Sequence, residues 1–211
     1  MKGLLYKDLC IMRQVYRTWL MICLLFLIIS FLNPKNPYWA VYSVFMLSSM
    51  VSGLQSMDET QKWTLYCEIL PITRSLQVTE KFLLSLLVVL AYTLFYTVAQ
   101  GILSLFGFGL SFSETCLIAG MIIVTGAVSI SVSLTTAFLF GPQKSQLGRM
   151  VLIAVTVGCG MLIITQASAV LSFLQSIPAV FLSLGIPLLS LLLFAAGWKI
   201  SCIGYEKRTF Q

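Results

Sequence analysis

The chain has 211 residues, of which 59% are hydrophobic and only 9% are charged, whereas an ordinary soluble domain carries about 25% charged residues. This small number of charged residues cannot cover the surface of a soluble protein of this size. We therefore expect a surface that faces lipid. The formal net charge is +6. Because the basic residues flank apolar runs, we attribute this charge to orientation in a membrane and expect no nucleic-acid partner.

The first predicted element, residues 1–17, is an amphipathic helix. Leu5, Leu9, Met12 and Tyr16 recur at helical spacing, and charged residues occupy much of the remainder. A helix of this kind lies in the interface of a bilayer, here leading into the first apolar run. A basic tail that only sets the orientation of the chain is equally compatible with the charges.

Six apolar runs follow, and each is a candidate transmembrane helix, since about 20 apolar residues cross the hydrocarbon core. The first run is short. We therefore predict an all-α, polytopic membrane protein that forms a single transmembrane domain over residues 1–211. The predicted spans are residues 18–32, 38–57, 82–106, 115–140, 150–171 and 179–199.

The Lys and Arg residues give the predicted orientation. Of the 13 such residues, only Lys35 falls on the second side of a six-span arrangement. The others lie in the N-terminal stretch, in the 58–81 and 141–149 connections and at the C-terminal end. Because cytoplasmic loops carry the excess of Lys and Arg, we expect both termini in the cytoplasm.

Few residues suit catalysis or ion coupling. The chain has no histidine, and none of its seven carboxylates falls in the middle of a predicted span. Its six cysteines show no metal-ligand spacing, and a GxxxxGK[ST] phosphate loop is missing. We therefore expect no enzyme activity, no metal and no cofactor on this chain, and any ATP hydrolysis must take place on another polypeptide.

Hydroxyl side chains do occur within the predicted spans. The 115–140 run carries several, including Ser131 and Thr135. Such side chains allow helices to approach closely and to hydrogen-bond. Packing within the bundle and lining of a substrate path are both compatible with this pattern.

The longest connection, residues 58–81, is predicted to contain a short helix. Trp63, Tyr66 and Ile69 share one face at helical spacing, and Pro71 ends the pattern. A short amphipathic helix on the cytoplasmic side can dock into a groove of a partner protein. It can equally lie on the lipid surface.

Two segments resemble a known family. The pattern D-E-x-x-K-W-x-x-Y-x-x-x-L-P-I-T-R-x-x-x-V-x-x-K, which runs from Asp58 to Lys81, resembles the cytoplasmic coupling segment of bacterial ABC-2 type permeases. The opening G-L-L-Y-K-D-L, residues 3–9, resembles their N-terminal interfacial helix. Within the family, the chain resembles small permeases of the phenol-soluble-modulin exporter and bacteriocin-immunity type.

The resemblance implies the permease subunit of an ATP-driven exporter in the bacterial cell membrane. Its substrate would be amphipathic or hydrophobic, peptides included. ATP and Mg would bind to a separate ABC ATPase subunit, and a second permease chain, identical or a sister, would complete the path. The resemblance assigns ATPase coupling to Glu59, Lys62, Trp63, Tyr66, Glu68, Leu70, Pro71 and Arg74, and the interfacial helix to Lys7 and Asp8.

Two other functions stay open at this point. One is the solute-binding membrane subunit of an energy-coupling-factor importer, which would hold a small ligand near its outer face. Few polar anchors are available there beyond Glu114, Gln166 and Gln175. The other is a membrane scaffold or immunity protein that transports nothing and needs no ATPase.

Overall fold

The computed structural model describes residues 2–32, 38–69, 73–107, 110–141, 150–151 and 179–207. Every regular element among these residues is a helix, which confirms the predicted all-α class. The helices are α1 (Lys2–Val15), α2 (Arg17–Leu32), α3 (Tyr38–Thr60), α4 (Trp63–Ile69), α5 (Arg74–Leu105), α6 (Phe112–Phe140) and α9 (Ala179–Glu206).

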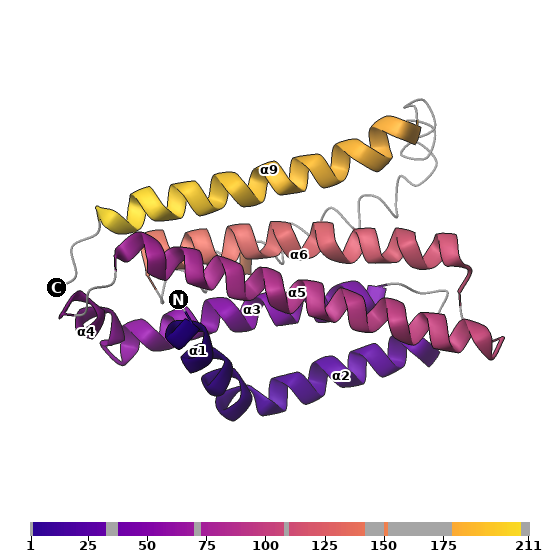
Figure 1. The fold of residues 1–211 in the computed structure, drawn as a ribbon, viewed down its shortest axis with the longest axis horizontal. Helices are drawn as coiled ribbons and strands as arrows, with labels where there is room; N and C mark the ends of the chain where they lie inside the picture. The colour runs from indigo at the N-terminus through magenta and orange to yellow at the C-terminus, as the bar shows by residue number, and fades with distance from the viewer. Residues whose placement is uncertain are drawn as a thin grey trace.

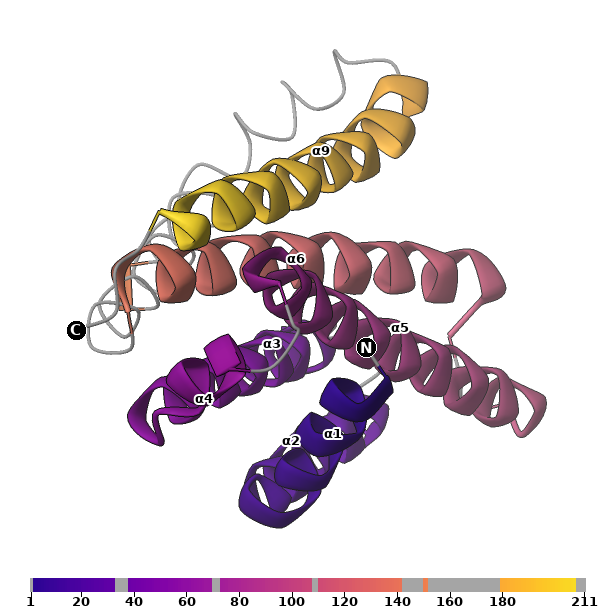
Figure 2. The same cartoon turned by 60° about the vertical axis from the view of Figure 1, so that its left-hand side comes forward.

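The long helices lie side by side in one bundle with α6 near its centre (Figures 1 and 2). Helix α6 packs against α3, α5 and α9, and α2 packs against α3. The short helix α4, the start of α5 and the end of α9 lie at the same end of the bundle, where α1 also begins (Figure 1). We call this the charged end, because it carries the ion pairs described below.

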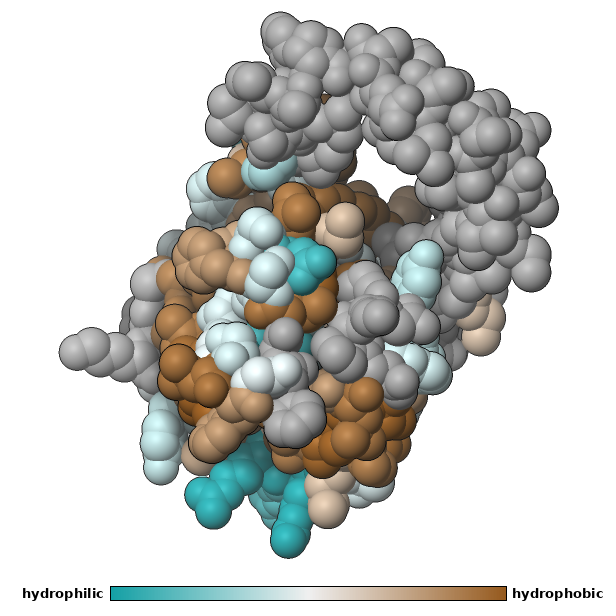
Figure 3. Space-filling view, turned by 90° about the vertical axis from the view of Figure 1, so that its right-hand side faces the viewer, coloured by the Kyte–Doolittle hydropathy of each residue, from teal (hydrophilic) through white to brown (hydrophobic). Residues whose placement is uncertain are grey.

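Among the described residues, three helices are long and apolar enough to cross a membrane: α5, α6 and the Pro187–Glu206 part of α9. The pair formed by α1 and α2 is a fourth candidate, bent by 76°. Leucine side chains are exposed along α5 and α9. The space-filling view from the end opposite the charged end shows hydrophobic residues over much of the described surface (Figure 3). The predicted 150–171 span lies outside the described residues, apart from residues 150–151.

Several helices are longer than the apolar runs that predicted them, and two of them extend into the predicted 58–81 connection. Helix α3 continues to Thr60 instead of ending at 57, and α5 begins at Arg74 instead of 82. The 58–81 connection is therefore mostly helical, and α5 gains about two turns. The added turns contain no proline or glycine, and Asp58 and Lys81 within them are paired with each other, which stabilises both helix ends.

The chain bends sharply between α1 and α2, at Tyr16. The backbone hydrogen bonds continue through the bend, since Tyr16 N donates to Met12 O at 3.1 Å and Leu20 N donates to Tyr16 O at 2.9 Å. The Tyr16 ring packs directly on Gly53 of α3, where a Cβ atom would collide with the phenol. A glycine in α3 thus makes room for the residue at which the chain turns.

Hydroxyl groups join α6 to α9. Ser131 Oγ donates to Leu193 O at 2.8 Å, and Thr135 Oγ1 donates to Gly197 O at 3.3 Å. Helices in lipid associate through close packing and hydrogen bonds of this kind, because lipid tails are as apolar as leucine. These two side chains therefore serve bundle packing.

Candidate functional site

Four charged side chains from three helices form a closed ring of ion pairs. Lys81 of α5 contacts both Asp8 of α1 and Asp58 of α3, the latter at 2.7 Å between Nζ and Oδ2. Lys7 of α1 completes the ring, because its Nζ lies 2.8 Å from Asp58 Oδ1 and 3.1 Å from Asp8 Oδ1. This charged ring joins α1, α3 and α5 at the charged end.

The charged ring is withdrawn from solvent. Asp8 is 0% exposed, Lys81 3% and Asp58 4%, while Lys7 is partly buried. Removing ions from water is costly, and the cost is offset only when each charge has a well-placed partner. Here two lysines face two aspartates, so the ring is formally neutral. Removing any one member would leave an uncompensated charge inside the protein.

A fifth ionisable side chain, Glu80, lies beside the ring and is only 2% exposed. Its Oε1 atom accepts no hydrogen bond from the part of the chain that the structure describes. A cavity of about 10 Å³ adjoins it, which is room for roughly one water molecule. The cavity is lined by Leu4, Lys7, Gln55, Asp58, Trp63, Gln77, Glu80 and Lys81.

Helix α4 contacts this cluster through one aromatic ring. The Lys7 Nζ atom lies 4.5 Å from the centroid of the Trp63 ring, a cation–π contact that contributes about 0.5–2 kcal/mol. The Trp63 ring also packs against Tyr66, with 5.4 Å between centroids. Lys7 therefore touches α4 on one side and the ring of ion pairs on the other.

A strained residue sets the direction of α4. Lys62, between α3 and α4, has a φ of 57°, in the left-handed region that L-residues with a Cβ adopt at a cost of roughly 1–2 kcal/mol. Its amide N donates to Glu59 O at 3.1 Å, which closes the end of α3. Within α4, burial raises the pKa of the Cys67 thiol, which keeps this side chain in its uncharged form.

The residues that the family resemblance assigns to ATPase coupling differ in exposure and in their hydrogen-bond partners. Lys62 and Tyr66 are exposed, and Trp63 is partly buried. Glu59 accepts a hydrogen bond from Gln55 Nε2 at 3.4 Å, and Arg74 Nη1 donates to the backbone carbonyl of Glu206 in α9 at 3.3 Å. The Glu68 side chain, Leu70 and Pro71 lie outside the described part of the structure.

The interfacial-helix residues differ from expectation in one respect. Asp8 was expected on the polar face of an interfacial helix, but its side chain is wholly buried against Lys81. The expected apolar face is only partly covered, since Met12 is buried while Leu9 is exposed. The reason is electrostatic: Asp8 gains two lysine partners inside the bundle, which offsets its loss of water.

The sequence placed Asp58, Glu80 and Lys81 in the predicted 58–81 connection, with Asp58 and Lys81 at the two ends of the resemblance pattern, but it did not indicate that they meet Asp8 and Lys7. One signal was available. Lys81 lies on the same helical face as Val78, Phe82 and Ser85, all of which are buried. A lysine on such a face requires a buried carboxylate as its partner.

Comparison with known families decides where the chain belongs. A family model described as ABC-2 family transporter protein matches residues 3–206. The chain belongs to the ABC-2 transporter family. The match includes α1, α4 and all four members of the charged ring. No curated protein and no solved structure matches the chain.

ABC-2 permeases are membrane components of ABC transporters, not themselves enzymes, and they normally work with an ABC ATPase partner. The resemblance drawn from residues 3–9 and 58–81 is therefore confirmed at the level of the family. The similarity to small peptide-exporter permeases stays a prediction.

Proposed function

We propose that this chain is the permease subunit of an ATP-driven ABC exporter, with six spans and both termini in the cytoplasm. It pairs with a second permease chain and with separate ATPase subunits that bind ATP and Mg. The observation that carries the proposal is the contact of Lys7 with Trp63, which joins α4 to the charged ring. Movement of α4 by an ATPase would thus act on α1, α3 and α5 together.

The exposed side of α4 suits a protein partner. Ile69 is 82% exposed, and Tyr66 and Lys62 are exposed beside it. A short helix with exposed aromatic and aliphatic side chains can enter a groove of another protein. The charged end would then face the cytoplasm, in agreement with the excess of Lys and Arg on that side.

The nature of the substrate is inferred from the bundle. Over the described parts of α5 and α6, the residues from 82 to 113 and from 115 to 140 include no charged side chain. Polar groups there are hydroxyls and Gln100. A path between two such permeases would suit amphipathic or hydrophobic substrates, peptides included, better than ions or sugars.

A pull-down in mild detergent from the native membrane tests the assembly. We expect the wild-type chain to carry with it an ABC ATPase, recognised by mass spectrometry through its phosphate-binding loop. Tyr66→Asp combined with Ile69→Asp should lose the ATPase, because both positions face outward on α4. Ser113→Asp, an exposed position at the start of α6, should retain it.

Recovery of the wild-type chain without an ATPase, in a detergent that preserves a known transporter complex, would contradict the proposal and favour a scaffold or immunity role. Tight binding of a small ligand by the purified chain alone would favour the importer subunit. In the intact complex, Trp63→Leu should keep the ATPase bound but weaken its coupling to transport, whereas Trp63→Phe, which retains an aromatic face, should not.

A further inference from the structure

Among the residues that the structure describes, Glu80 has no counter-charge left to pair with. In the charged ring, Lys81 already contacts Asp8 and Asp58, and Lys7 contacts the same two carboxylates. The two positive and two negative charges cancel. An ionised Glu80 would therefore give this buried cluster a net charge of −1, in surroundings where an unpaired ion is very costly.

A like charge lies directly beside Glu80. The carboxylate of Asp8, which contacts the neighbouring residue Lys81, acts on Glu80 as a like charge. Two neighbouring carboxylates cannot both ionise cheaply, and burial disfavours the ionised form further. A protonated Glu80 resolves both problems, because it is neutral and its O–H can donate to a carboxylate.

The other groups around Glu80 do not supply a substitute for the proton. Helix α3 contributes Asp58 and the neutral Gln55, while α4 contributes Trp63 and, at longer range, the Cys67 thiol. Gln77, which also lines the cavity, is held from α9 by Tyr205, whose hydroxyl donates to Gln77 Oε1 at 3.2 Å. Among the described residues, no three His, Cys, Asp or Glu side chains are placed to hold a metal ion, and two lysine ammonium groups line the cavity.

We propose that Glu80 is a proton-binding site, whose carboxyl group carries a proton while α1 is docked on the bundle and whose ionisation releases α1. The force acts between two helices, because Glu80 belongs to α5 and Asp8 to α1. When the proton leaves, the two carboxylates repel each other across this contact. The site is a property of the chain alone and does not depend on the proposed export function.

The direction of the pH dependence follows from proton counting. Two states are compared: one in which α1 is docked and Glu80 is protonated, and one in which α1 is released and Glu80 faces water. At pH values where an ordinary glutamate is ionised, the docked state holds one more proton. Docking of α1 therefore weakens as the pH rises, by up to about tenfold per pH unit. The proton passes only between Glu80 and water, so no other reactant is needed.

Distance measurements between spin labels test the proposal on the full chain in lipid nanodiscs. The six native cysteines are replaced by alanine, and labels are attached at Tyr6→Cys on α1 and Ser113→Cys on α6, both exposed positions. We expect one narrow distance at about pH 5 and a broad or longer one at about pH 9. Glu80→Gln, which is permanently uncharged, should keep the narrow distance at both.

The matched control is Glu206→Gln, because Glu206 is an exposed glutamate on α9 and its loss should leave the pH response intact. A wild-type distance that is the same at both pH values, or a Glu80→Gln variant that still responds, would overturn the proposal.

Infrared spectroscopy of the wild-type chain gives a second test that needs no substitution. An ordinary carboxyl group is ionised at neutral pH, so a protonated-carboxyl stretching band at neutral pH should come from Glu80 and vanish at alkaline pH. A spectrum without this band at neutral pH would equally overturn the proposal.

Discussion

Lys81 is the residue on which the charged end depends most. It is buried, and it holds the carboxylates of Asp8 and Asp58 from two other helices. A buried ion pair contributes little net stability compared with an apolar pair of similar shape, but its one-sided removal is costly. The ring therefore makes the packing of α1 specific, because any partial replacement leaves an unpaired charge.

Replacing Lys81 with methionine should lower the free energy of unfolding by about 3–5 kcal/mol, since two aspartates then share the single ammonium group of Lys7. Unfolding in detergent, followed by circular dichroism, measures the change. Lys199→Met, at an exposed position on α9, should change stability by less than about 0.5 kcal/mol. Equal losses in the two variants would mean that the ring has no special role.

Exchanging the charges gives a stricter test of the pairing. Asp8→Lys alone and Lys81→Asp alone should each destabilise the chain strongly. The double variant restores one positive and one negative charge at the contact and should recover part of the loss, measured as a coupling free energy of about 0.5–3 kcal/mol. Additive losses would contradict direct contact between the two side chains.

At the scale of the helices, close approach around Gly126 holds α6 in the centre. A Cβ atom at this position would lie 2.8 Å from the Val89 side chain of α5 and 3.1 Å from that of Val44 in α3. Both neighbours are buried and branched at Cβ, so they have little freedom to move aside. Gly126 thus allows three helices to meet.

Gly126→Ala should destabilise the bundle by about 1–3 kcal/mol through overpacking. Gly120→Ala is the matched control on the same helix, because a Cβ atom there meets nothing within 4 Å. The control should be neutral or more stable by up to about 1 kcal/mol, since alanine is the better helix former. Midpoints of thermal unfolding in detergent compare the two; a more stable Gly126→Ala would refute the packing argument.

The helices could be predicted from the sequence more readily than their ends. The apolar runs marked α2, α3, α5, α6 and α9, because a long stretch without charge has few alternatives to a helix in lipid. The first two turns of α5 were missed, since charged residues such as Lys81 at the edge of a run suggest a loop. Only the partners on α1 and α3 make those turns stable, and their proximity cannot be deduced from sequence spacing.

The candidate site divides in the same way. The face of α4 with Trp63 and Tyr66 follows from helical spacing within one segment, so it was predictable. The charged ring joins three segments that lie far apart along the chain, at positions 7–8, 58 and 81. Their contact depends on how α1 folds back on the bundle. The 76° bend at Tyr16 could not be predicted, because the sequence around it contains no proline or glycine.

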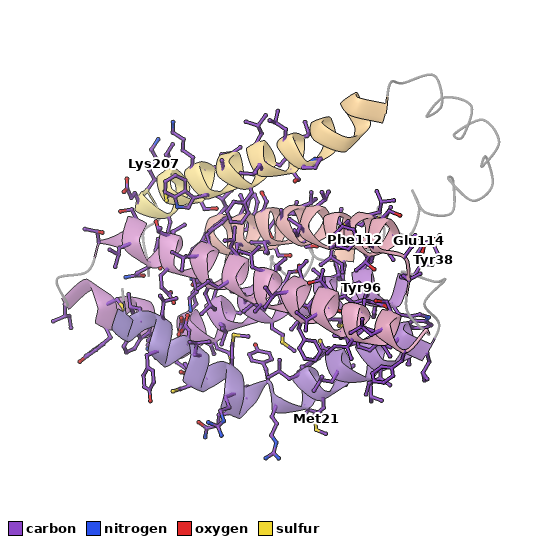
Figure 4. The ribbon with its side chains drawn as sticks, turned by 45° about the vertical axis from the view of Figure 1, so that its right-hand side comes forward. Met21, Tyr38, Tyr96, Phe112, Glu114 and Lys207 are labelled. Carbon is purple, nitrogen blue, oxygen red and sulfur yellow. The ribbon has the colours of Figure 1, made fainter. Side chains whose placement is uncertain are left out.

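At the scale of the whole molecule, the two ends of the bundle differ in chemistry. Lys207 lies at the end that holds the charged ring, whereas Tyr38, Phe112 and Glu114 lie at the other (Figure 4). At that other end, Ser111 and Glu114 cap α6 reciprocally: Ser111 N donates to Glu114 Oε2 at 3.0 Å, and Glu114 N donates to Ser111 Oγ at 3.4 Å. The concentration of basic residues at the charged end favours its placement in the cytoplasm.

Labelling of single cysteines in intact cells tests this orientation. In a background without the native cysteines, Ser113→Cys at the start of α6 should react with a membrane-impermeant thiol reagent added outside. Gln61→Cys, between α3 and α4, should react only after the membrane is permeabilised. Both positions are exposed and lie next to helix ends, so a difference between them reports the side of the membrane and not burial. The reverse pattern would place α4 outside the cell, beyond the reach of a cytoplasmic ATPase, and labelling of both from outside would mean that α5 does not separate the two positions across the membrane as proposed.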